Sequence, residues 1–229
     1  MPQRPPPSDP LPTLLDYHPP TEPDLVVIHE DNDILIFDKP SGLLSVPGRH
    51  PSLWDSIRHR ARKRWPTAEM VHRLDKDTSG LILMALNKPA HAKLGMQFEK
   101  RSTRKSYVAR VDGVLTDDEG LVDLPLMTDW DNKPRQRVDF ENGREARTQW
   151  SVIDREEIAT RLRLVPLTGR THQLRVHMKA IGHVILGDAF YAEGNALAAA
   201  DRLQLHAEEL GFVHPTTGED CTFVVKAPF

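Results

Sequence analysis

The sequence predicts an α+β fold, and two observations lead to this class. Five short stretches that read as strands follow one another between residues 105 and 165, separated by turn residues. The helical patterns lie mostly outside this block, whereas a doubly wound parallel sheet would alternate strands with helices along the chain. We therefore expect a central mixed and mainly antiparallel sheet with flanking helices.

The composition is that of an ordinary soluble protein. The 229 residues are 39% hydrophobic and 28% charged, with a formal net charge of -3, and they can bury a substantial core. No stretch reads as a signal peptide or a membrane span. The single Cys221 can build neither an internal disulfide nor a thiolate metal site. A cytoplasmic monomer without membrane contact is expected, and any nucleic-acid partner must be argued from local basic clusters.

The N-terminal part divides into an arm and the start of a domain. Nine of the first 23 residues are proline, a density that blocks both helix and central strand. We expect residues 1–24 to be a mostly disordered arm and residues 25–229 a single domain. Its first two strands are predicted at 25–29 and 34–37, and 39–48 is predicted to be an ordered loop.

The remaining elements follow from periodicity and from start and stop signals. A helix from Ser52 to about Trp65 has Ser52 as its N-cap, Asp55 at the capping-box spacing and Pro66 after its end. Helices are also expected at about 89–100, 171–181 and 196–200. Strands are expected at 81–86, 106–111, 120–124, 137–140, 146–152, 158–164, 203–213 and 221–225, with hairpin turns containing Asp112-Gly113 and Asn142-Gly143.

The segment 71–80 places a carboxylate, Asp75, between basic neighbours and just before an apolar strand. An unpaired buried carboxylate is strongly disfavoured, so Asp75 must find cations, and Arg73 is one candidate. The segment has two interpretations on spacing alone. Asp75 is either an ionised catalyst in a cleft or one half of a structural ion pair at a strand entry.

A second segment, 168–177, joins a glycine turn to a helix and carries two arginines, two histidines and a glutamine. Leu174 belongs to the buried stripe of this helix, which leaves Arg175 beside the stripe at the edge of the core. Arg175 could there neutralise Asp75 bidentately and keep it charged at neutral pH. The alternative is a solvated helix that happens to be basic.

The two histidines of this helix do not suggest a metal site. His172 and His177 are five residues apart, so their side chains diverge by about 140 degrees on a helix. No cysteine or carboxylate cluster completes a ligand shell. We expect these histidines to hydrogen-bond within the loop or to phosphate, and we expect no metal.

Three basic clusters could offset phosphate charge despite the acidic total. They are Arg58, Arg60, Arg62, Lys63 and Arg64; Lys100, Arg101, Arg104 and Lys105; and Lys133, Arg135 and Arg137. Each cluster taken singly is more often a solvated face. Tyr107 follows the second cluster on a predicted strand, where an aromatic ring beside cations suits base stacking, although an ordinary core tyrosine fits the pattern equally well.

Five ordered motifs together resemble the RluA family of pseudouridine synthases. The likeness covers about residues 22–229, and the motifs are Asp38-Lys39-Pro40-Ser41-Gly42-Leu43, His72 to Leu81, Lys105-Ser106-Tyr107-Val108-Ala109, Thr168 to His177, and Ile185-Leu186-Gly187-Asp188. It implies the pseudouridine synthase fold, with a catalytic cleft, and leaves no room for the N-terminal S4 RNA-binding domain of several relatives. The sequence departs from the family pattern at Val184, where proline is usual.

The resemblance also implies roles for individual residues. Asp75 is expected to be the catalytic aspartate, Tyr107 the stacking and general-base tyrosine, Arg175 the cation paired with Asp75, and Arg73 the side chain that fills the gap left by a flipped base. The other expected RNA contacts are His72, Arg170, His172, Leu174, Arg58, Arg62 and Lys105.

The reaction implied by the resemblance is isomerisation of uridine in the tRNA anticodon stem-loop and/or 23S ribosomal RNA. It involves no net redox change and therefore needs no cofactor. The same chemistry on a different uridine is one alternative. A non-catalytic RNA-binding module and a metal-dependent nuclease are others, but the first has no need of Asp75 paired with Arg175 and the second needs a ligand shell.

Overall fold

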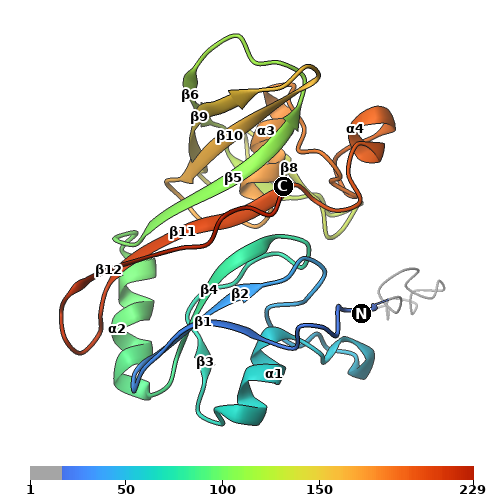
Figure 1. The fold of residues 1–229 in the computed structure, drawn as a ribbon. Helices are drawn as coiled ribbons and strands as arrows, with labels where there is room; N and C mark the ends of the chain where they lie inside the picture. Colours follow the sequence, from blue (N-terminus) through green and yellow to red (C-terminus); the bar gives the residue numbers. More distant parts are fainter. Residues whose placement is uncertain (1–16) are drawn as a thin grey trace, which may run out of the picture.

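One large sheet runs through the molecule (Figure 1), and the computed structural model describes residues 17–229. The strand order is β1-β2-β4-β11-β5-β10-β9-β6, with β12 paired to β11 and β3 to β4, and β7 and β8 form a separate two-stranded sheet. The strands are β1 (Val26–Glu30), β2 (Ile34–Lys39), β3 (Glu69–Met70), β4 (Ser79–Ala85), β5 (Arg104–Asp112), β6 (Glu119–Asp123), β7 (Leu126–Thr128), β8 (Gln136–Val138), β9 (Arg147–Arg155), β10 (Ala159–Pro166), β11 (Leu205–Val213) and β12 (Asp220–Val224). The helices are the 3-10 turn η1 (Pro51–Leu53), α1 (Ile57–Arg64), α2 (Lys88–Glu99), α3 (Gln173–Ala180) and α4 (Gly194–Ala198).

The expected α+β class with a mixed, mainly antiparallel sheet is confirmed. Among the described residues every strand pair is antiparallel except β4 and β11, which run parallel where Ser79 faces His206 and Gly80 faces Ala207. Glycine is required at this junction, because Gly80 has φ +108 and a Cβ there would lie 2.3 Å from the Ala207 carbonyl oxygen. The close approach brings the loop before β4 next to the centre of the sheet.

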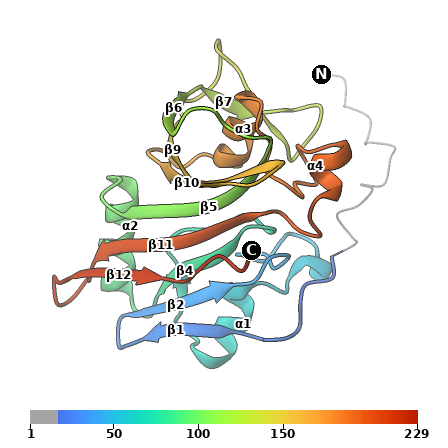
Figure 2. The same cartoon turned by 45° about the horizontal axis from the view of Figure 1, so that its top comes forward.

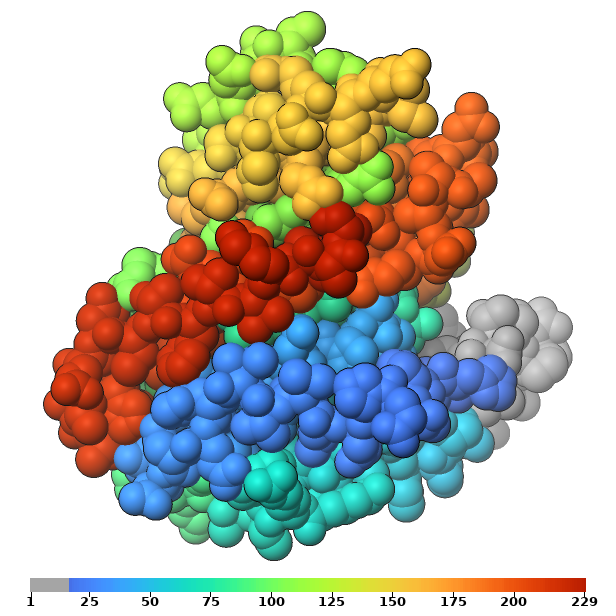
Figure 3. Space-filling view, in the orientation of Figure 1, coloured from blue at the N-terminus to red at the C-terminus, as the bar shows by residue number. Residues whose placement is uncertain are grey.

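Two of the large hydrophobic clusters on the sheet lie in different halves of the molecule. The N-terminal cluster joins Phe37 of β2 and Ile82 of β4 to Ile57 of α1, and the other joins Leu162 of β10 to Met178 of α3. Figure 2 shows β11 and β5 crossing between these halves. Figure 3 shows the same division on the surface, where the red C-terminal strands separate the blue N-terminal part from the yellow part.

Residues 17–24 are held against the domain, so the expectation of a disordered arm is wrong for this stretch. The hydroxyl of Tyr17 donates to the Asp55 carbonyl at 2.9 Å and accepts the N–H of Leu44 at 2.9 Å. Arg60 donates to the carbonyls of Pro20 at 2.7 Å and Asp24 at 3.1 Å. The buried Arg60 guanidinium thus finds two of its acceptors in this stretch. Residues 1–16, the rest of the predicted arm, lie outside the described residues.

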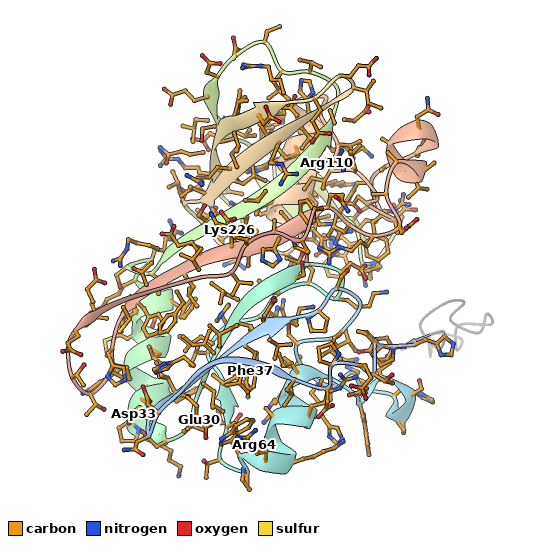
Figure 4. The ribbon with its side chains drawn as sticks, in the orientation of Figure 1. Glu30, Asp33, Phe37, Arg64, Arg110 and Lys226 are labelled. Carbon is orange, nitrogen blue, oxygen red and sulfur yellow. The ribbon has the colours of Figure 1, made fainter. Side chains whose placement is uncertain are left out.

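The first α-helix begins later than predicted. Ser52 lies in the 3-10 turn η1, and Ser56 caps α1 by accepting the N–H of His59 at 3.2 Å. Asp55 does not complete a capping box, because its two carboxylate oxygens bind Arg60 at 2.8 and 2.7 Å. The end of the helix before Pro66 is as predicted. Figure 4 shows Arg64 at this end beside Glu30 of β1, and the two form an ion pair at 3.5 Å.

The two turns expected to close hairpins do not do so. The strand before Asp112-Gly113 pairs with β10 and β11, not with β6. The strand before Asn142-Gly143 pairs with β7, a strand that the sequence did not predict. Turn chemistry marks where the chain reverses but does not fix which strand it then joins.

None of the helices within residues 17–229 is long and apolar enough to span a membrane.

Candidate active site

Most of the predicted site residues meet in one cleft of about 990 Å³. Its walls come from the loop before β4, the start of β5 and the loop before α3. The cleft is lined by Asp75, Tyr107, His72, Arg73, Lys105, Arg170, His172 and Leu174. Arg175 lies behind the wall, and Arg58 and Arg62 lie elsewhere, on α1.

The loop that carries Asp75 is fixed from below by a buried lysine. The Lys39 ammonium donates to the carbonyls of Pro40 at 2.9 Å, Leu43 at 2.7 Å and Lys76 at 2.9 Å. Its three N–H groups are matched by three carbonyls, although burial lowers the pKa of Lys39 to about 7. The lysine therefore ties the residue after Asp75 to the loop after β2.

Two further residues of the predicted ordered loop reinforce this attachment. The Ser45 hydroxyl donates to the Leu74 carbonyl at 2.6 Å and accepts the Leu74 N–H at 3.0 Å. The Ser41 hydroxyl donates to the Asp77 carbonyl at 2.7 Å. The backbone on both sides of Asp75 is thus hydrogen-bonded to one neighbouring loop, which limits how far the carboxylate can move.

The expected bidentate pair between Arg175 and Asp75 is wrong. Arg175 Nε and Nη2 bind Asp188 Oδ2 and Oδ1 at 2.8 and 2.6 Å, while only Nη1 reaches Asp75 Oδ2, at 3.4 Å. Arg175 is also not at the core edge but buried, with its guanidinium 5.1 and 5.2 Å from the rings of Phe190 and Tyr191. Burial lowers the pKa of Arg175, but the hydrogen bonds and charge of Asp188 outweigh it and the pKa is raised. A buried arginine needs a full carboxylate partner, and Asp188 supplies one.

His172 is the second polar side chain that faces Asp75. Its Nε2 lies 3.9 Å from Asp75 Oδ2, and its Nδ1 lies 2.7 Å from the hydroxyl of Tyr191. Burial lowers the pKa of His172, so the ring is neutral at physiological pH. His172 directly precedes α3 and has φ +53, a left-handed conformation that turns its ring toward Asp75.

Tyr107 lies on β5 at the seam between the two halves. Its ring packs against a hydrophobic cluster of each half and lines the cleft. Burial and then the negative charge of Asp75 raise the pKa of Tyr107, so it carries its proton at neutral pH. The ring can stack on a base, and its hydroxyl donates a hydrogen bond and can accept a proton only after it has given up its own.

His72 and Arg73 are adjacent in the chain but differ in their contacts. His72 Nε2 accepts the N–H of Leu83 at 2.9 Å, and its ring stacks on Phe98 with centroids 4.6 Å apart. Burial and the charge of Lys105 lower the pKa of His72 to about 3. His72 therefore ties the Asp75 loop to β4, whereas Arg73 is exposed at the cleft.

The rim of the cleft is basic. Its cations include Arg101, Arg104, Lys105, Arg144, Arg163 and Arg170, and its acids include Glu99 and Glu209. Arg170 is positioned by a hydrogen bond from its Nε to the Glu145 carbonyl at 2.9 Å. The loop that carries Arg170 is fixed by Gln173, whose Oε1 accepts from Thr168 Oγ1 at 2.7 Å and from the Arg170 N–H at 3.0 Å. Apolar Leu174 lines the same wall.

The basic cluster on α1 is largely neutralised within the fold. Arg58 binds Glu69 of β3 at 2.9 Å, and Arg62 approaches the same carboxylate at 3.4 Å. Neither side chain lines the cleft. The structure therefore does not bring Arg58 and Arg62 together with Asp75.

Within residues 17–229 no histidine forms a group with Asp75 that could hold a metal ion. His177 faces Thr148 and Leu124 at 2.8 and 3.0 Å, away from the cleft. In the part of the chain that the structure describes, the one group with ligand atoms within 4.8 Å of one another is Asp31, Asp33 and His214. His214 Nδ1 accepts backbone N–H groups, so its proton is on Nε2 and is donated to Asp31, which leaves no lone pair toward an ion.

Sequence reasoning missed three residues of this site. Lys39 and Asp188 both stand in the motifs that suggested the family, but no role was attached to them. Their charges could have identified them, because a charged residue next to an apolar stretch needs a partner when it is buried. Tyr191 gave no comparable signal, because its contact with His172 depends on the fold.

Comparison with known proteins identifies a consistent set of relatives. The family model described as RNA pseudouridylate synthase matches residues 33–180. The dual-specificity RNA pseudouridine synthase RluA of Yersinia pestis is 52% identical over 206 residues, which cover 90% of this chain and 100% of that protein. The protein of the same name from Escherichia coli K12 is 51% identical, over 93% of this chain and 98% of that one. Among solved structures, human RNA Pseudouridylate Synthase Domain Containing 1 is 28% identical, with a TM-score of 0.76 over 90% of this chain and 84% of that chain.

Proposed function

Because the chain belongs to the RNA pseudouridylate synthase family and is thus an enzyme that converts uridine to pseudouridine in RNA, we propose that Asp75 is its catalytic carboxylate. The supporting observation is how Asp75 is held. Its side chain is 28% exposed in the cleft, and its Oδ2 faces Arg175 and His172. Within residues 17–229 no group hydrogen-bonds to Oδ1, so this oxygen is available to a substrate.

The reaction needs an ionised carboxylate but no redox partner. The bond between uracil N1 and ribose C1′ breaks, the base rotates, a bond forms between C5 and C1′, and the proton on C5 is exchanged for one on N1. Asp75 can begin this by attacking C1′, by adding to the ring or by removing a ribose proton. Each route requires its negative charge, and Arg175 stabilises that charge without enclosing it.

The remaining cleft residues are proposed to handle the base. A uridine must leave its stack to reach Asp75, which costs a few kcal/mol. Exposed Arg73 is suited to fill the vacated place, and the Tyr107 ring to stack on the extruded base. Leu174 contributes apolar surface that excludes water beside the reacting atoms.

The substrate is proposed to be a uridine in the tRNA anticodon stem-loop and/or 23S ribosomal RNA. The names of the bacterial relatives describe dual-specificity RNA enzymes. The basic rim with Lys105 and Arg170 is suited to a phosphate backbone on either RNA. A cytoplasmic location is proposed because both RNAs are used in translation, and action as a monomer stays a prediction.

The proposal is tested by replacing Asp75. Wild type, Asp75→Ala and Asp75→Asn are incubated with tRNA and large-subunit rRNA fragments, and pseudouridine is mapped by carbodiimide-blocked reverse transcription. Both variants should bind RNA and form no product, while the matched surface control Asp117→Asn keeps the wild-type rate. Appreciable turnover by either Asp75 variant would show that the assignment is wrong. RNA cleavage that is lost on chelation would instead indicate a nuclease.

Tyr107→Phe separates the two tasks of the tyrosine. The substitution keeps the ring and removes the hydroxyl, so stacking persists while proton transfer is lost. We expect RNA affinity to be kept and single-turnover rate to fall by about 100-fold or more. A wild-type rate for this variant would remove the general-base assignment and leave stacking as the task of Tyr107.

A further inference from the structure

The hydrogen bonds around His172 fix which of its two nitrogens carries the proton. Tyr191 Oη accepts the backbone N–H of Gln136 at 2.8 Å and lies 2.7 Å from His172 Nδ1. Tyr191 and His172 are both buried, at 6% and 8% exposed. The phenol proton has one acceptor here, Nδ1, because Gln136 N is itself a donor. Tyr191 therefore donates to Nδ1, and the proton of the neutral imidazole is on Nε2.

The same conclusion follows from the other side of the ring. Nε2 faces Asp75 Oδ2 at 3.9 Å. A lone pair on Nε2 would oppose the carboxylate lone pairs, whereas an N–H is attracted to them. Burial raises the pKa of Tyr191 to about 12, and the phenol keeps the proton that it donates.

From this arrangement, which rests on the proposed function of Asp75, we infer that Tyr191 and His172 are positioning residues for the catalytic carboxylate. Tyr191 sets the tautomer of His172, and the His172 Nε2–H and Arg175 Nη1 both face Oδ2. Oδ2 is thereby turned to the protein, and Oδ1 is the oxygen that acts on the uridine. A neutral imidazole serves this purpose better than a second cation, because an imidazolium added to Arg175 would form a further ion pair with Asp75 and weaken it as a nucleophile or base.

The charged and titratable groups that face His172 are consistent with a neutral ring. Asp75, Asp77 and Asp188 favour the imidazolium, while burial and Arg175 oppose it and prevail. The hydrogen bond from Tyr191 adds to this balance, because it engages Nδ1 only when that nitrogen is unprotonated. Removal of the Tyr191 hydroxyl should therefore raise the pKa of His172 and free its tautomer.

The test compares wild type, Tyr191→Phe, His172→Asn and the double variant across pH 6 to 8.5. Single-turnover pseudouridine formation is measured, and the histidine ring nitrogens are followed by 15N NMR of the full-length protein. Tyr191→Phe should slow the reaction about 10-fold at pH 6 and less than about 3-fold at pH 8.5, the scale of one hydrogen bond. The His172 signal should change from the Nε2–H form to a titrating mixture.

His172→Asn keeps the left-handed backbone, which asparagine tolerates, and shortens the side chain away from Asp75. It also removes the titrating ring, so the double variant should lack the added pH dependence of Tyr191→Phe. Partly exposed His183, bound to the Asp112 carbonyl, provides the control: His183→Gln should react like wild type.

Two results would overturn the inference. One is an unchanged His172 tautomer in Tyr191→Phe, and the other is a rate loss that is equal at every pH. If wild type forms no pseudouridine, the proposed function fails, but the NMR arm still decides whether Tyr191 sets the tautomer of His172.

Discussion

Arg175 binds Asp188 through two nitrogens and reaches Asp75 with only one. The two bonds to Asp188 are 2.8 and 2.6 Å long, and the contact with Asp75 is 3.4 Å. Asp188 and Arg175 are 0% and 2% exposed. The strong pair fixes the guanidinium, and the longer contact stabilises the charge of Asp75 without enclosing the carboxylate that we propose to be catalytic.

Asp188→Asn should damage both stability and rate. Asparagine has the shape of the aspartate but no charge, so Arg175 becomes a buried cation without its main partner. We expect the free energy of unfolding to fall by about 3–5 kcal/mol. Urea denaturation measures this, and the single-turnover rate should fall with it. The control Asp118→Asn breaks the exposed pair with Arg155 and should cost at most about 1 kcal/mol. Equal stabilities of the two variants would contradict this account.

Lys39→Met tests how the Asp75 loop is held. Methionine fills a similar volume but donates nothing, so the carbonyls of Pro40, Leu43 and Lys76 lose their shared partner. A displacement of about 1 Å at a reacting group can cost 100-fold in rate, and we expect a loss of that order. The measurement is the single-turnover rate at saturating enzyme, with exposed Lys63→Met as control. A folded Lys39→Met with the wild-type rate would show that the other loop contacts suffice.

The fold class could be predicted because the local pattern decides it, but strand partners could not. The stretches around β5, β9 and β10 are apolar at strand spacing, and each forms a strand close to the predicted bounds. The pairing of β4 with β11 depends on contact between residues far apart in the chain, such as Gly80 and Ala207. Turn residues determine where the chain reverses direction, while long-range packing determines which strands pair.

The site was predicted in part for the same reason. The sequence brought Asp75, Tyr107 and Arg175 together through motifs, and the structure places the first two in one cleft with Arg175 directly behind Asp75. Charge alone could not tell which carboxylate Arg175 prefers, because Asp75 and Asp188 are both compatible with the sequence. Only their different burial distinguishes them, and burial follows from the tertiary fold.

Arg170→Ala and Arg58→Ala should separate the basic rim of the cleft from the basic face of α1. Arg170 lines the cleft, whereas Arg58 is paired with Glu69. RNA binding by Arg170→Ala should weaken several-fold, and the slope of log affinity against log salt should fall by about 0.7 to 1, as for one lost phosphate contact. Arg58→Ala should have the RNA affinity and the salt dependence of wild type. Both are measured by filter binding over about 50–300 mM salt. The reverse ranking would place the RNA across α1.

His72→Gln should remove part of the acid sensitivity of the fold. The pKa of His72 is lowered by burial to about 3, below the ordinary value of 6.5 in the unfolded chain. The unfolded state therefore takes up a proton as pH falls below 6.5 while the folded state does not, so this stability is present above 6.5 and is lost toward pH 3. At pH 5 the loss is about 2 kcal/mol, from about 1.4 kcal/mol per pH unit.

Glutamine at position 72 can still accept the Leu83 N–H but does not titrate. Urea unfolding at pH 7.5 and pH 5 should thus show a loss about 2 kcal/mol smaller in the variant than in wild type. His172, His177 and His206 also have lowered pKa values, but they are present in both proteins and cancel in the difference. Equal losses in the two proteins would mean that His72 is protonated in the folded state and that the Asp75 loop is held to β4 by other contacts.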